Sequence, residues 1–166
     1  MSLSIYGKQP SGERLKRIQS SPNYKKGSFQ NLTPTNAMSE DASFYKMMRE
    51  YINKPKLIKP SVALPTVETN LKKLPTNNLK IVWFGHSSYM ITLDGKTILV
   101  DPVLSGNAAP VSCMVKSFKG SDWHQPSDFP EIDVLVITHD HYDHLDYKTV
   151  LALKKKVKNV VCALGV

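Results

Sequence analysis

Three histidines and three aspartates are concentrated in one short stretch of this chain, ITHDHYDHLD at residues 137–146. Imidazole nitrogens and carboxylate oxygens are ligands for zinc, and also for iron and manganese. Histidines two residues apart on extended backbone point the same way, so His139 and His141 could hold one ion. Asp143 and His144 lie on the following turn and would face a second ion. Such crowding costs solvation that a metal offsets well, which argues against a loop that only caps a helix.

The ligand-rich stretch stands between elements of a predicted α/β fold. The apolar run IDVLVIT at 132–138 is typical of a strand buried on both faces. Asp146 is expected to cap a helix over about 147–158, and the apolar run at 159–166 predicts another strand. Strand, helix and strand would form a βαβ unit, so the sheet should be partly parallel.

Three more strands are predicted upstream, over 79–84, 88–93 and 96–100. Asp94-Gly95 is the two-residue signal for a type I′ turn between the second and third of them. Residues 103–131 would then form a long loop, and loops of this length are often functional.

The first 78 residues are predicted to form a basic extension of the domain at 79–166. Residues 1–80 carry fourteen Lys and Arg against five Asp and Glu, whereas residues 81–166 carry eight against nine. Residues 1–38 are expected to be irregular, and the proline-rich residues 54–78 to form an extended connector.

One amphipathic helix is predicted within this extension, over about 39–53, with Ser39 as its N-cap. Its apolar side consists of Phe44, Met47, Met48, Tyr51 and Ile52. The pattern favours docking on the parent domain over contact with a membrane or a partner.

Apolar runs, cysteines and charge restrict the cellular compartment and the binding partners that we expect. No stretch approaches the roughly 18 apolar residues of a membrane span, and the N-terminus has no apolar signal-peptide core. These features predict a cytoplasmic protein whose membrane contact, if any, is peripheral. Cys113 and Cys162 are not spaced as a metal pair, and Cys162 is expected to be a buried free thiol. The basic segment suits phosphate-rich partners or is simply a solvated arm.

The motif H-x-H-x-D-H after an apolar strand resembles the signature of the metallo-β-lactamase superfamily. Together with WFGHSSYMITLDGKTILVDPVL upstream, the string THDHYDHLDYKTV resembles the branch that contains N-acyl-phosphatidylethanolamine phospholipase D and its bacterial relatives. The resemblance implies an αβ/βα sandwich of two similar halves with a mixed sheet. Residues 79–166 would be the first half.

The same resemblance implies the roles of the ligands. His139 and His141 would ligate the first of two zinc ions, and Asp143 and His144 the second. Asp143 would also orient the nucleophilic hydroxide, which makes it the catalytic residue.

Three further residues are implied to lie behind the ligands or near the substrate. Asp101 would accept hydrogen bonds from the ligand loop. His86, in GHSS, would lie near the mouth of the site, unless it is a structural histidine. Asp140 would support the neighbouring ligands.

The function implied is that of a zinc-dependent hydrolase, a phosphodiesterase that cleaves an N-acylated phospholipid by metal-hydroxide attack, with iron or manganese as alternative metals. A nuclease or lactonase of the same superfamily, or a non-catalytic truncated protein, are the alternatives. Nucleic acid is a less favoured partner because the basic arm lacks aromatic residues in a stacking pattern.

The superfamily's complete site also needs two more histidines and a bridging aspartate downstream. Only 22 residues follow His144, and none of them is a histidine. The chain is therefore expected to be a fragment that needs a C-terminal half or a second chain. Alone it should bind metal weakly and be inactive.

Overall fold

The computed structural model describes residues 3–36, 38–39, 41–55, 58–110 and 115–166. The chain divides into two compact units, one formed by residues 1–8 with 62–166 and the other by residues 9–61. Cys113 lies outside the described residues.

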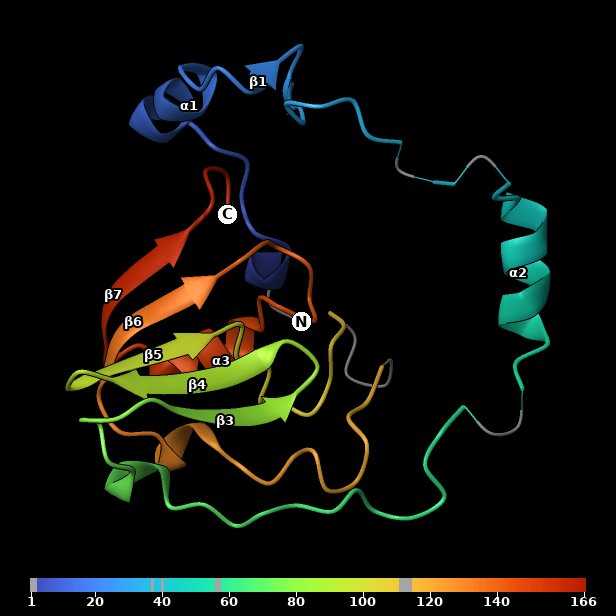
Figure 1. The fold of residues 1–166 in the computed structure, drawn as a ribbon. Coiled ribbons are helices and arrows are strands. Elements are labelled where there is room, and N and C mark those ends of the chain that lie inside the picture. Colours follow the sequence, from blue (N-terminus) through green and yellow to red (C-terminus); the bar gives the residue numbers. More distant parts are fainter. Residues whose placement is uncertain (1–2, 37, 40, 56–57, 111–114) are drawn as a thin grey trace. The chain divides into compact units, whose positions relative to one another are not determined.

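The larger unit is built on one five-stranded mixed sheet, with strand order β3-β4-β5-β6-β7 (Figure 1). The strands are β3 Lys80–Gly85, β4 Ser88–Leu93, β5 Lys96–Val100, β6 Ile132–Ile137 and β7 Val157–Cys162. The pairs β3/β4 and β4/β5 are antiparallel, whereas β5/β6 and β6/β7 are parallel. The predicted α/β class with a mixed sheet is confirmed.

Two tight turns connect the antiparallel strands. Asp94 and Gly95 have φ of 49° and 74°, so the β4–β5 turn is the predicted turn with two left-handed residues. The β3–β4 turn is less ordinary, because it places the non-glycine residue His86 at φ = 47° after Gly85 at φ = 105°. This turn matters for the site described below.

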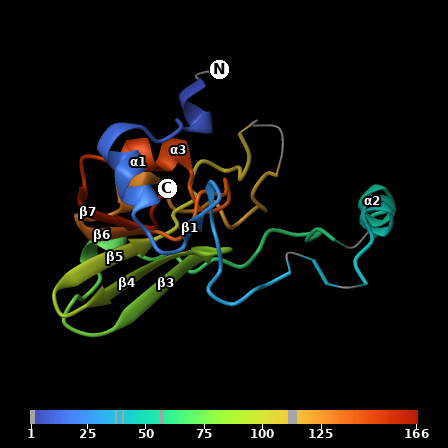
Figure 2. The same ribbon diagram turned by 90° about the horizontal axis from the view of Figure 1, so that it is seen from above.

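One face of the sheet is packed into the core. Met90 pairs with Leu99, which pairs with Leu135, so the three side chains share a face, and all are at most 2% exposed. Helix α3 (Tyr147–Leu153) lies against the sheet in both views and adds the fully buried Leu153 to this cluster (Figure 2). Phe129 completes it from the long loop.

The other face of the sheet carries apolar side chains that the described residues leave uncovered. Ile81 pairs with Ile91, and Trp83 pairs with Tyr89, so these rows lie opposite the packed cluster. Ile81, Trp83 and Val161 are 62%, 69% and 55% exposed.

The C-terminal elements depart from the prediction in two ways. Helix α3 ends at Leu153 instead of near residue 158, and Val157 already begins strand β7. The Nζ of Lys156 donates to the carbonyls of Pro126, Ser127 and Phe129, which holds the chain in a turn. The expected buried thiol is also wrong, because Cys162 is exposed at the end of the edge strand β7.

The connector before the sheet is held against the long loop. Leu64 N–H donates to the carbonyl of Lys119 at 2.8 Å, and Thr66 Oγ1 donates to that of Gly120. Gly120 has φ = 90°, and a Cβ there would lie 2.3 Å from the carbonyl oxygen of Leu64. Short 3₁₀ turns interrupt the extended connector and the loop, at η2 (Leu71–Lys73) and η3 (Pro126–Asp128), and a third, η1 (Leu3–Tyr6), lies near the N-terminus.

The smaller unit contains more structure than predicted. Residues 1–38 were expected to be irregular, but this region includes α1 (Gly12–Gln19) and the short strands β1 (Tyr24–Lys25) and β2 (Ser28–Phe29). Only Leu15 and Ile18 give α1 an apolar side, and Ile18 is buried. Two apolar residues are too few for a periodic signal, which is why the sequence pattern missed this helix.

The predicted amphipathic helix is present but shorter, as α2 (Phe44–Ile52). Its N-cap is Ser43, whose Oγ accepts the N–H of Lys46 at 3.4 Å, and not Ser39. Helix α2 buries none of its residues, so the docking of its apolar side on the parent domain stays a prediction. No helix among the described residues is long and apolar enough to cross a membrane.

Candidate metal centre

The ligand-rich loop leaves the sheet at the carboxyl end of β6, where α/β proteins commonly bind ligands. The carbonyl of His141 accepts the N–H groups of His144 and Leu145, at 3.0 and 2.8 Å. This turn reverses the chain between His141 and His144, so residues on both sides of it return to the end of β6.

Asp101 is the buried centre of the site. It follows β5, is 1% exposed and has φ = 41°. Its Oδ1 accepts the backbone N–H of Thr138 at 2.8 Å, and its Oδ2 accepts the Thr138 hydroxyl at 2.6 Å. The same Oδ2 lies 2.8 Å from Nδ1 of His144. Asp101 thus joins the end of β6 to the turn that follows.

The charge on Asp101 is stabilised by these contacts. Burial raises the pKa of Asp101, but hydrogen bonds from His144 and Thr138 outweigh it and hold the pKa below the ordinary carboxyl value. Asp101 is therefore a carboxylate under ordinary conditions, and it accepts hydrogen bonds at both oxygens.

Ser88, which the sequence reasoning did not single out, fixes the backbone at Asp101. Its Oγ donates to the carbonyl of Asp101 at 2.6 Å and accepts the N–H of Val103 at 3.1 Å. Ser88 is 2% exposed. These bonds stabilise the left-handed conformation of Asp101, which is uncommon for a residue other than glycine. A small hydroxyl at the start of a strand gives no signal of such a role.

The Asp101 contact also determines what His144 can offer. A carboxylate can only accept hydrogen bonds, so Nδ1 of His144 carries a proton and donates the hydrogen bond to Asp101. In the neutral imidazole Nε2 then presents a lone pair, and this nitrogen lies 3.9 Å from Oδ2 of Asp143. Metal-ligating histidines in proteins are commonly oriented by a carboxylate in this way.

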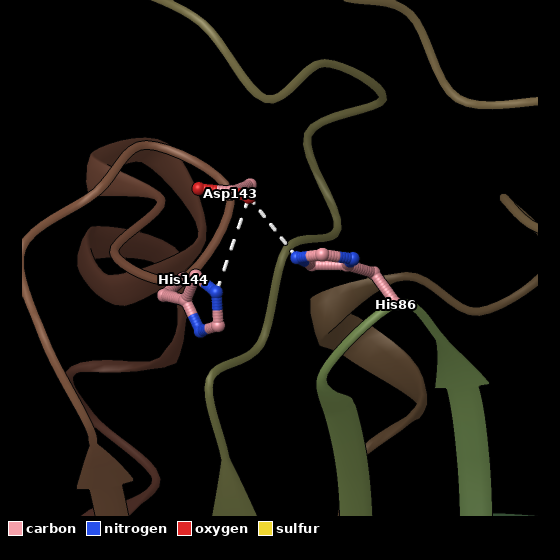
Figure 3. A group of neighbouring side chains, drawn as sticks. All are labelled: His86, Asp143 and His144. Carbon is pink, nitrogen blue, oxygen red and sulfur yellow. Dashed lines mark ion pairs between the residues drawn. The ribbon is translucent and has the colours of Figure 1, made fainter. Parts of the chain in front are cut away.

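His86 reaches Asp143 from the β3–β4 turn. Its Nε2 lies 3.0 Å from Oδ2 of Asp143. Figure 3 shows the two imidazole rings on different sides of this carboxylate, each joined to it by a dashed line. Within the part of the chain that the structure describes, only His86, Asp143 and His144 form a group of three metal-ligating side chains whose ligand atoms lie within 4.8 Å of one another.

His139 and His141 are close to this group but do not complete a second one among the described residues. Their ring centroids are 4.6 Å apart, and the His139 ring lies 3.9 Å from that of His144. Nδ1 of His139 is 3.0 Å from the Thr138 hydroxyl. The structure brings all three histidines of the motif together, while the assignment of His139 and His141 to a first ion stays a prediction.

The other two aspartates of this stretch, Asp140 between two histidines and Asp146 after the last one, differ in burial and contacts. Asp140 is exposed and has no hydrogen-bond or ion-pair partner among the described residues, so its supporting role stays a prediction. Asp146 is buried and caps α3, as predicted, by accepting the N–H groups of Lys148 and Thr149. Its Oδ2 also accepts the N–H of Ser105, which fixes the start of the long loop.

The donor set fits a divalent transition metal. Two imidazole nitrogens and one carboxylate oxygen converge, one imidazole is already oriented by Asp101, and such mixed N and O sets suit zinc, iron or manganese. A lysine or arginine in place of the histidines would instead have formed ion pairs with the carboxylates.

Comparisons with known proteins agree with this interpretation. The profile of the β-lactamase superfamily domain matches residues 80–161, which contain the whole five-stranded sheet apart from the last residue of β7. The chain belongs to the metallo-β-lactamase superfamily through this domain. The predicted family is thus confirmed.

Several curated proteins are similar over parts of the chain. An uncharacterized protein of Mycobacterium tuberculosis is 33% identical over 136 residues, 81% of this chain and 37% of that protein. The N-acyl-phosphatidylethanolamine-hydrolyzing phospholipase D 1 of Caenorhabditis elegans is 33% identical over 89 residues, 51% of this chain and 22% of that protein. A metal-dependent hydrolase of Methylocella silvestris is 40% identical over 67 residues, 40% of this chain and 24% of that protein. The chain therefore spans well under half the length of these relatives.

Proposed function

We propose that this chain contributes to a metal-dependent hydrolase that cleaves a phosphodiester in an N-acylated phospholipid. The convergence of His86, Asp143 and His144 over the buried Asp101 carries the hydrolase part of the proposal. The similarity to the nematode phospholipase D, 33% identical over 89 residues, supports the substrate class.

The residues of this chain would divide the work between binding and orientation. A bound divalent ion, zinc in the first instance and iron or manganese as alternatives, would lower the pKa of water at the site and neutralise charge on a phosphate. Asp143 and His144 would hold such an ion, and His139 and His141 a second one. Asp101 and Thr138 keep the His144 ring in place. Asp143, exposed at the mouth, can also accept a proton from a water beside the phosphorus.

We also propose that a second structural layer covers the uncovered face of the sheet. Ile81, Trp83 and Val161 form an apolar surface of the kind that stable proteins cover. The superfamily's sandwich has a second layer in this place, which would also bring the remaining ligands. That layer belongs either to the same polypeptide or to a second chain.

The test uses the protein expressed from the complete open reading frame and loaded with zinc. We expect it to release N-acylethanolamine and phosphatidate from vesicles that contain N-acyl-phosphatidylethanolamine. In water labelled with oxygen-18 the label should enter phosphatidate, since attack on phosphorus breaks the bond to the leaving alcohol. Asp143→Asn should reduce the rate at least about 100-fold, as loss of a metal ligand and proton acceptor would. Cleavage of RNA or of a lactone with no activity on these vesicles would overturn the proposed substrate.

A further inference from the structure

His86 stands outside the H-x-H-x-D-H motif, yet it makes the shortest side-chain contact to Asp143, at 3.0 Å. It comes from the β3–β4 turn, whereas Asp143 and His144 come from the loop after β6. The question is whether this contact is only a hydrogen bond between exposed groups or part of a metal site.

The arrangement of donors and acceptors favours a metal site. His144 donates the hydrogen bond from its Nδ1 to Asp101, so its Nε2 carries a lone pair. This Nε2 lies 3.9 Å from Oδ2 of Asp143, and both atoms are hydrogen-bond acceptors. The Nε2 of His86 approaches the same oxygen. A cation among these three atoms satisfies all of them at once, whereas the His86–Asp143 hydrogen bond leaves the lone pair of His144 unmatched.

The backbone at His86 is held in a conformation that serves this side chain. Its φ of 47° is uncommon for a residue other than glycine, although histidine adopts it more often than most residues do. The carbonyl of His86 accepts the indole N–H of Trp83 at 2.9 Å, which fixes the turn. Residues kept in such conformations are concentrated at functional sites, and Asp101, at φ = 41°, is a second one in the same site.

The contact between His86 and Asp143 would do little as an ordinary surface pair. The two side chains are 58% and 41% exposed, and exposed pairs of this kind contribute little stability. Stability therefore does not account for the uncommon backbone at His86, whereas a ligand role does.

We propose that His86 is the third protein ligand of the ion held by Asp143 and His144, coordinating through Nε2. This inference rests on the proposed function only in requiring that Asp143 and His144 bind a metal. Two imidazoles and one carboxylate with open positions form a site for a zinc-like divalent ion. The β3–β4 turn then belongs to the metal centre itself.

The experiment titrates the full chain with cobalt(II), whose visible absorption and paramagnetically shifted imidazole N–H signals report coordination. The variant His86→Asn tests the proposal, because asparagine tolerates a positive φ and can still donate a hydrogen bond to Asp143. We expect cobalt affinity to fall at least about tenfold and one shifted imidazole signal to be lost. The matched control is His124→Asn, which leaves the same number of histidines. His124 packs on Phe84 and lies outside the three-residue group.

The outcomes separate this proposal from the one it rests on. If His86→Asn binds cobalt as the unchanged chain does and keeps every shifted signal, the ligand role of His86 is overturned while the metal centre stands. If the unchanged chain binds cobalt no better than a variant with both Asp143→Ala and His144→Ala, the metal centre itself fails. Circular dichroism of every variant establishes that the fold is retained.

Discussion

The two ends of strand β6 each carry a cluster built on carboxylates, and they are closed in different ways. At its start, Asp133 accepts the N–H of Thr97 at 2.9 Å and Nζ of Lys158 at 3.0 Å, with Lys96 nearby at 3.9 Å. At its far end, Asp101 and Asp143 meet histidines instead. Lysine brings its own positive charge, so the first cluster is complete without any ion.

The histidine cluster is complete only at its base. Asp101 is buried and accepts hydrogen bonds at both oxygens, whereas Asp143 is partly exposed and faces two imidazole nitrogens. The base of the site is therefore organised by the protein's own hydrogen bonds. The upper part has potential ligand atoms in place, and we propose that a cation holds them together.

The largest effect is expected from Asp101→Ala. The substitution leaves the backbone N–H and hydroxyl of Thr138 and the Nδ1–H of His144 without their acceptor, and it puts alanine at φ = 41°. We expect the free energy of unfolding in urea to fall by about 3–5 kcal/mol, as when one partner of a buried pair is removed. Asp143→Ala is the control and should change it by less than about 1 kcal/mol, since the Asp143 side chain is 41% exposed and its contacts are to partly exposed groups. Equal effects would show that the base is no better organised than the mouth.

The next effect is that of zinc. Free zinc at about 100 times its dissociation constant should raise the free energy of unfolding by about 2.7 kcal/mol. His144→Ala should abolish this gain. Asp133→Asn, at the end of β6 where Lys158 pairs with the carboxylate, should keep it. The measurement is urea unfolding with buffered zinc, at concentrations set by calorimetry. The same gain in His144→Ala would place the ion elsewhere.

The contrast between the two clusters also shows how far the sequence could go. Strands β4 and β5, the turn at Asp94-Gly95 and the cap at Asp146 were predicted at their observed positions, because hairpin turns and helix caps depend on neighbouring residues. The motif at 139–144 predicted a metal centre, because few other uses explain so many potential ligands. The contact between His86 and Asp143 joins two distant segments, so spacing alone left His86 undecided between a structural and a functional role.

Tertiary contacts account for what the sequence pattern got wrong. The run Lys154–Lys156 has good helix propensity, yet the chain turns there because Lys156 donates to three carbonyls and its own carbonyl accepts the N–H of Ile132 at 2.8 Å. The apolar run at 159–166 resembled a buried strand, but among the described residues β7 pairs with β6 alone and is the edge of the sheet. Its residues Val160, Val161 and Cys162 are therefore exposed.

A smaller effect is expected from pH at the start of β6. The N–H of Thr97 and then Lys158 lower the pKa of Asp133 below 3.8. A carboxyl with a lowered pKa in the folded state stabilises the fold above its unfolded value and loses that contribution as pH falls through the folded pKa. Stability should thus decline more steeply below pH 3.8 in the unchanged chain than in Asp133→Asn. Asp122→Asn, an exposed loop control, should leave the slope unchanged, and urea unfolding at pH 7, 4 and 3 measures all three.

The smallest effect is the coupling between His86 and Asp143 without metal. In a double-mutant cycle of His86→Asn and Asp143→Asn, an exposed pair should contribute less than about 1 kcal/mol to the free energy of unfolding. With saturating zinc the two residues share one ion, so the coupling energy should rise well above the metal-free value. The cycle is measured by urea unfolding with and without buffered zinc. Because the lysine-closed pair Asp133–Lys158 needs no ion, its own cycle should give the same coupling in both conditions. A zinc-independent coupling at His86–Asp143 would make the two ends of β6 alike, and the far end would then be an ion pair like the first.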